Sequence, residues 1–197
     1  MIDTFDVKPS GLTLARSNFS PHTGYPNGGS SSFRIGWRNV TTPGYSYYYN
    51  AFFILDFSEF ADRRVTQDNL ISAKFRLSGV SGNHGLTSAL YRVLRNVTAS
   101  LDWQTYNGTN NWAVAGGTGS GTDRSSSPLM TMSEKGVQEL TLSAATLFSI
   151  YNDSWKFGIY TTSSIPQYDN YHNLTYDDTV IRISYNRYNL AGDATMF

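Results

Sequence analysis

Alternation of apolar and polar side chains dominates this chain, whereas a helical repeat is nearly absent. In residues 71–77 every second side chain is apolar, and Ser72, Lys74 and Arg76 alternate with them. A period of two predicts an antiparallel strand with one face buried and the other in water. The run Ala51–Phe57 is apolar on both faces, which predicts a central strand that is covered on both sides.

Short apolar runs between loops rich in Gly, Asn and Ser predict the remaining strands. These runs fall at residues 32–37, 89–94, 137–142, 155–160 and 179–185. Only residues 143–151 have a helical pattern, with Ser143 as the expected N-cap. The sequence therefore predicts an all-β fold, a jelly-roll β-sandwich of antiparallel strands with one short helix.

A single domain is expected, because 197 residues fall within the range of one all-β sandwich. We assign this domain to residues 17–185 and expect residues 1–16 and 186–197 to be N-terminal and C-terminal arms. Arms of this kind attach a folded body to its neighbours through backbone hydrogen bonds and aromatic anchors. Phe5 and Phe197 are the expected anchors of such a partner interface.

Composition and charge exclude several classes of protein. The formal net charge is +0 and the arginines are scattered, so the basic surface that nucleic-acid binding needs is missing. No apolar stretch is long enough to span a membrane, and the N-terminus does not have the pattern of a signal peptide. We therefore expect a protein that is made in the cytoplasm and has neither a membrane nor a nucleic acid as its partner.

Motifs for catalysis and for metal binding are missing from the sequence. There is no Gly-x-Ser-x-Gly motif, no phosphate-binding loop and no cysteine. The three histidines lie far apart, without metal-ligand spacing. Asp123 and Asp177–Asp178 have oxygen atoms that suit calcium, but they do not form a calcium-loop pattern. We expect a protein that is not an enzyme and has no cofactor and no metal site.

An aromatic segment followed by a glycine-rich one is the most distinctive part of the sequence. Trp103, Tyr106 and Trp112 lie close together, with Asn107 among several asparagines. One interpretation is a glycan site, in which sugar rings stack on the aromatic rings and asparagines bind the hydroxyl groups. The other is that the tryptophans close the end of the sandwich core. We expect Trp103 to be the core residue and Trp112 to be exposed.

A second aromatic cluster precedes the central strand. Tyr45, Tyr47 and Tyr49 would share one face of an extended strand, and Tyr48 would join Phe52 on the other. Tyrosine-rich surfaces are typical of partner interfaces, but ordinary packing on an edge strand produces the same pattern. Both interpretations of this cluster stay open.

Four segments occur in an order that carries a family resemblance. They are the Asn/Gly/Ser turn and strand of Tyr25–Gly36, the strand Phe53–Ser58, the strand Ile71–Leu77, and Tyr91-Arg-Val93 followed by Trp103 and Trp112–Gly117. In order and spacing they resemble the DNRLRE-type domain, a jelly-roll module grouped with carbohydrate-binding module family 96. The resemblance covers roughly Asn18–Tyr185.

The resemblance implies a jelly-roll fold and a role in binding. Members of this family occur in exported enzymes and surface proteins, and also in viral tail fibres and capsid accessory proteins. We therefore expect a non-catalytic virion component of a tailed phage, in the capsid decoration, fibre or tail. It would attach to other virion proteins by its arms and form a homo-oligomer, for example a trimer. The alternative is a carbohydrate-binding module that stacks a cell-surface glycan on the loop aromatics.

Overall fold

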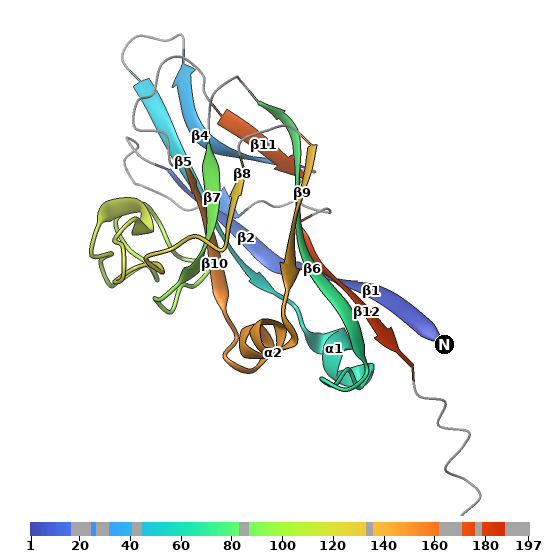
Figure 1. Ribbon diagram of the computed structural model, residues 1–197. Coiled ribbons are helices and arrows are strands. Elements are labelled where there is room, and N and C mark those ends of the chain that lie inside the picture. Colours follow the sequence, from blue (N-terminus) through green and yellow to red (C-terminus); the bar gives the residue numbers. More distant parts are fainter. Residues whose placement is uncertain are drawn as a thin grey trace, which may run out of the picture.

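The computed structural model describes residues 1–16, 25–26, 32–40, 45–82, 87–132, 136–161, 171–175 and 179–187. Within these residues the chain is built of antiparallel strands with two α-helices and one 3-10 turn (Figure 1). The strands are β1 (Ile2–Val7), β2 (Pro9–Arg16), β3 (Tyr25–Pro26), β4 (Ser32–Val40), β5 (Tyr45–Leu55), β6 (Leu70–Gly82), β7 (Ser88–Val93), β8 (Met130–Met132), β9 (Gly136–Leu142), β10 (Lys156–Thr161), β11 (Tyr171–Thr175) and β12 (Val180–Asn186). The expected all-β class, an antiparallel sandwich, is confirmed.

The helices lie at one end of the sandwich (Figure 1). Helix α2 (Ala144–Asn152) is the predicted one, and the Ser143 hydroxyl caps it by accepting a hydrogen bond from the Thr146 N–H at 3.1 Å. Helix α1 (Ser58–Asp62) is a single turn that the sequence pattern did not indicate. No helix in the described ranges has the length and apolar character needed to cross a membrane.

Two layers enclose the core. Layer A consists of β2, β5, β10, β7 and β8, and layer B consists of β1, β12, β6 and β9. Strands β4 and β11 join the layers, because β4 pairs with β5 and β11 pairs with both β4 and β6. Phe157 of layer A lies 5.4 Å from the Phe53 ring in its own layer and 5.2 Å from the Phe75 ring in layer B. These three buried rings tie the layers together.

Strand β6 follows the alternation of its sequence. Ala73, Phe75 and Leu77 are fully buried, whereas Lys74 and Arg76 point outward, where each contacts Glu139 on β9. Ile71 is a difference from the prediction, since 46% of it is exposed. Its pairing with β12 is interrupted by a register shift between Ser184 and Tyr185. The bulge takes the start of the strand out of the regular inward and outward pattern.

The first sixteen residues do not form the expected N-terminal arm. They are strands β1 and β2, which pair with β12 and β5 and so lie on different layers. Phe5 is only 7% exposed and packs edge-on against Tyr185 at 5.9 Å, so it is a core residue and not an interface anchor. The reason is an alternation in β1 that directs Phe5 and Val7 inward while β12 pairs the backbone. Of the expected C-terminal arm only Asn186 and Arg187 are described, and Phe197 lies outside the described residues.

The outer face of layer A, which points away from the core, is also covered by protein. Phe52, Tyr91, Val93 and Tyr160 form an apolar outer cluster, separate from the core between the layers. Residues 94–129, here called the cap, lie over this cluster on the left of Figure 1. The prediction that the central strand is covered on both faces is confirmed, because Phe53 faces the core and Phe52 faces the cap.

Candidate functional site

A single buried carboxylate organises the cap. Asp123 has no exposed surface, and its two oxygens accept hydrogen bonds from the backbone N–H groups of Ala113 and Val114, both at 2.9 Å, and of Gly119 at 3.2 Å. The Arg95 side chain adds a charged hydrogen bond at 3.1 Å. These contacts join the start of the cap at Arg95 to residues 113–123 of a segment that has little secondary structure of its own.

The charge of Asp123 is stabilised by the same contacts. Burial alone raises the pKa of the Asp123 carboxyl, but the donors from Ala113 and Val114, with Arg95 and Gly119, outweigh burial and leave the pKa below its usual value. The carboxylate therefore stays ionised through the neutral range. Because N–H donors occupy both oxygens, Asp123 has a structural role, in contrast to the calcium ligation considered from its sequence.

Trp112 attaches the cap to the sheet. Its ring stacks on Phe52 with centroids 5.2 Å apart, and its Nε1–H donates to the Asp102 carbonyl at 3.0 Å. Only 5% of Trp112 is exposed, so the expectation that it lies on the surface is wrong. An outward-facing Phe52 on a central strand needs an apolar cover, and Trp112 supplies it. A sugar could not stack on this ring while the cap is in place.

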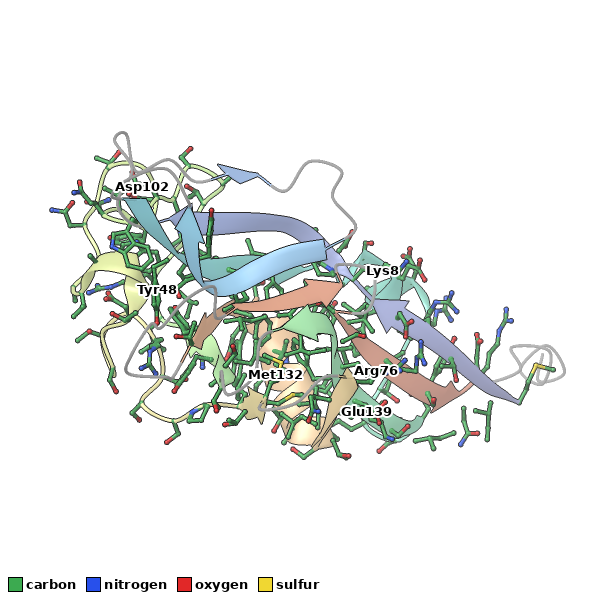
Figure 2. The ribbon with its side chains drawn as sticks, turned by 90° about the horizontal axis from the view of Figure 1, so that it is seen from above. Lys8, Tyr48, Arg76, Asp102, Met132 and Glu139 are labelled. Carbon is green, nitrogen blue, oxygen red and sulfur yellow. The ribbon has the colours of Figure 1, made fainter. Side chains whose placement is uncertain are left out.

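Trp103, expected in the core, instead lies half-buried at the edge of the cap. Its ring packs on the backbone of Gly116, where a Cβ would come within 2.7 Å of the indole and where φ is +76°. Tyr48 of β5 meets Trp103 edge-on at 5.8 Å, and Tyr48 lies at the same end of the molecule as Asp102 (Figure 2). Trp103 therefore has one packed face and keeps part of its surface open to solvent.

Tyr106 and the asparagines complete this surface. The Tyr106 ring is half-buried, edge-on to Trp112 at 5.7 Å. Asn107 accepts hydrogen bonds from the N–H groups of Thr109 and Asn110 at 3.1 and 2.8 Å, which fixes the turn and leaves its amide NH2 free to donate. We call the partly or fully exposed residues of this region the cap rim: Trp103, Tyr106, Asn107, Asn110 and Asn111.

Sequence reasoning missed the contact that joins strand β5 to the cap. Asn50 is fully buried, and its side-chain amide donates to the Gly116 carbonyl at 2.9 Å. Two residues earlier on the same strand, the Tyr48 hydroxyl contacts the Thr161 hydroxyl. An asparagine between tyrosines and a run of apolar residues was the available signal, since a polar side chain inside such a run must have a partner.

The tyrosine cluster lies on β5 as expected. Tyr45 and Tyr47 pair with Val40 and Arg38 of β4, and their side chains lie outside the described residues. Tyr49 is half-buried. The structure places these residues on one strand, and Tyr48 of the same cluster contacts Trp103 of the cap rim.

Trp155 is, like Trp103, a half-buried tryptophan, and the sequence indicated it only as the start of a strand. The Arg92 guanidinium lies over its ring at 4.1 Å, and its Nε1–H donates to Asp153 at 3.3 Å. Trp155 lines two cavities, of about 320 and 220 Å³. Trp155 is therefore an aromatic surface of comparable kind, away from the cap rim.

A comparison with protein-family models finds no match to this chain, and a comparison with curated proteins finds none either. The resemblance to the DNRLRE-type domain therefore rests on the four sequence segments alone.

Proposed function

We propose that this chain is a non-catalytic binding protein that holds a glycan on the cap rim. The observation that supports this is the contrast within the cap. Asp123 and Trp112 are buried and hold the cap on the sheet, whereas Trp103 and Tyr106 keep part of their rings open beside exposed amide groups. Aromatic rings on a rigid base, with a few hydrogen-bonding groups around them, are what a sugar ring needs for stacking and orientation.

The glycan proposal is tested by Trp103→Ala. Loss of one stacking ring should weaken glycan binding roughly fivefold, since an aromatic contact contributes about 1 kcal/mol. Ligands would be found by screening a glycan array, and affinities would be measured by isothermal titration calorimetry. Trp155→Ala is the matched control, because it removes a half-exposed tryptophan elsewhere and should leave the affinity unchanged.

Two results would contradict this proposal. A folded wild-type protein that binds nothing on the array would exclude glycan recognition. Equal affinities of wild type and Trp103→Ala, with a loss in Trp155→Ala, would move the site away from the cap rim.

We also propose a setting for this activity: the protein is an accessory component of a virus particle, attached through the residues that follow β12. The observation that favours it is the position of the two described ends. The Arg187 N–H donates to the Met1 carbonyl at 2.9 Å, so these ends meet at the end of layer B (Figure 1). The cap lies at the opposite end, so attachment beyond Arg187 would leave the cap rim free.

Deletion of residues 188–197 tests the attachment. The sandwich should stay folded, because all the strand pairing that the described residues show lies before residue 187. Self-association and incorporation into particles should be lost, which light scattering of the pure protein and co-purification with particles would measure. A truncated protein with the oligomeric mass and particle occupancy of the full chain would contradict the proposal.

A further inference from the structure

A cavity of about 540 Å³ lies between β1, the end of β12 and the turn that follows α1. Three arginines line it, Arg63, Arg64 and Arg187, together with the carboxyl groups of Asp3 and Asp62. The elements that supply its lining, β1, β12 and α1 with the turn after it, lie at the end of layer B away from the cap (Figure 1). Its volume is in the range of small-molecule and side-chain binding sites.

One of the three arginines is already neutralised. Arg63 donates to Asp3 at 3.1 Å and to Glu59 at 3.0 Å. Asp3 in turn accepts from the Tyr185 hydroxyl at 3.1 Å and from the Thr4 N–H at 2.9 Å. Arg63 is therefore paired with two carboxylates, that of Asp3, which lines the cavity, and that of Glu59, which does not.

The other two arginines that line the cavity are Arg64 and Arg187. Neither Arg64 nor Arg187 forms an ion pair with any of the described residues. Asp62 is the one further carboxylate among the residues that line the cavity. Counted over the residues that line the cavity, three guanidinium groups stand against two carboxylates, an excess of one positive charge.

The turn that carries Arg64 is held in a strained conformation. Arg64 has φ +52°, which is rare for a residue with a side chain. Asn69, only 2% exposed, fixes it by donating to the Arg64 carbonyl at 3.1 Å and accepting from the Thr66 N–H at 2.7 Å. Strain of this kind persists where the surroundings impose it, and it accumulates at binding sites. Here it places an arginine on the wall of a cavity.

We propose that this cavity binds the carboxylate of an acidic organic group, held between Arg64 and Arg187. A guanidinium binds a carboxylate through two parallel N–H···O bonds, which gives both strength and orientation. The excess of one positive charge among the lining residues fits a carboxylate better than a doubly charged phosphate. A glutamate or aspartate side chain of a partner protein and a free organic acid share this chemistry. The proposal does not depend on whether the cap rim binds a glycan.

The experiment titrates the full chain at low salt with four probes, using isothermal titration calorimetry and chemical-shift changes. The probes are acetate, inorganic phosphate, the peptide acetyl-Ala-Glu-Ala-amide and its glutamine counterpart. Arg64→Gly removes the side chain and relieves the positive φ, so the variant stays folded. Loss of one charged hydrogen-bond donor should weaken binding of the glutamate peptide about tenfold, and Arg187→Ala should do the same.

Two further variants give the proposal a sharper test. Asp62→Asn removes one of the two carboxylates that line the cavity and should strengthen carboxylate binding severalfold, with phosphate now accepted as well. Lys8→Ala is the matched control. Lys8 is an exposed cation in the connection between β1 and β2, and it does not line the cavity.

Each outcome decides the proposal. Glutamate peptide bound more tightly than acetate supports a protein partner, and equal binding per carboxylate supports a free acid. Glutamine peptide bound as well as glutamate peptide overturns the proposal, as does tighter binding of phosphate by the wild-type chain. Equal losses in Lys8→Ala and Arg64→Gly would show a general charge effect and overturn it too, and so would no binding of either carboxylate.

Discussion

Replacing Asp123 with alanine is expected to detach the cap from layer A while leaving the sandwich folded. The substitution removes the acceptor of three backbone N–H groups and leaves the Arg95 guanidinium without its partner. Breaking a buried charged contact of this kind costs about 3–5 kcal/mol. A segment that has little secondary structure of its own cannot offset that loss, so the effect should be concentrated in residues 94–129.

Amide hydrogen exchange, read segment by segment, measures this effect. Protection should fall across the cap and persist in the strands of the core. Asp102→Ala is the matched control in the same segment, because the half-exposed Asp102 carboxylate caps a local turn through Gln104 and Thr105. It should cost only about 1 kcal/mol. Equal exchange in the two variants would show that Asp123 is not the organising residue.

Gly119→Ala examines the same contact from the opposite side. An added Cβ would lie 2.6 Å from the Asp123 carboxylate, so either the turn or the carboxylate must move. Loosening of the cap in this variant, with the carboxyl group still present, would assign the effect to the geometry of the contact and not to the charge alone.

Replacing Phe157 with alanine should lower the stability of the whole sandwich. Phe157 is fully buried between the layers and contacts Phe53 and Phe75. Removing a buried phenyl ring costs about 3–5 kcal/mol, because the apolar surface is lost and a cavity is left behind. For a chain of this length the melting temperature should fall by roughly 6–20 °C.

Thermal unfolding followed by circular dichroism measures the Phe157 effect. Phe57→Ala is the control, since Phe57 is a half-buried phenylalanine at the surface near α1. Its melting temperature should change much less. A melting temperature for Phe157→Ala as high as that of Phe57→Ala would mean that the three-ring contact does not hold the layers together.

The sequence predicted those elements whose pattern is local. Alternation along β6 identified the buried Ala73, Phe75 and Leu77, and the hydroxyl of Ser143 marked the start of α2. The apolar run around Phe52 indicated a strand covered on both faces before the cap was seen to cover it. In each case the signal, either the period of the side chains or the residue that caps the helix, is set within a few positions of the chain.

The candidate site was predicted less well, because it depends on contacts between distant residues. Trp103 and Trp112 occur in similar local sequences, and the identity of the buried one was decided by Phe52, some sixty residues earlier, to which Trp112 gives cover. Met1–Arg16 looked like an arm because its short alternation gave no sign of its partners. Pairing with β12, at the other end of the chain, is what places β1 in the sheet.

The chain by itself determined the class of fold and the residues available for binding, since strand period, turn residues and composition are local properties. Tertiary structure alone decided which aromatic rings are left open, where the buried Asp123 finds its donors, and that Arg64 and Arg187 meet in one cavity. The physical reason is that exposure, hydrogen-bond satisfaction and net charge at a site are set by residues brought together from distant segments of the chain.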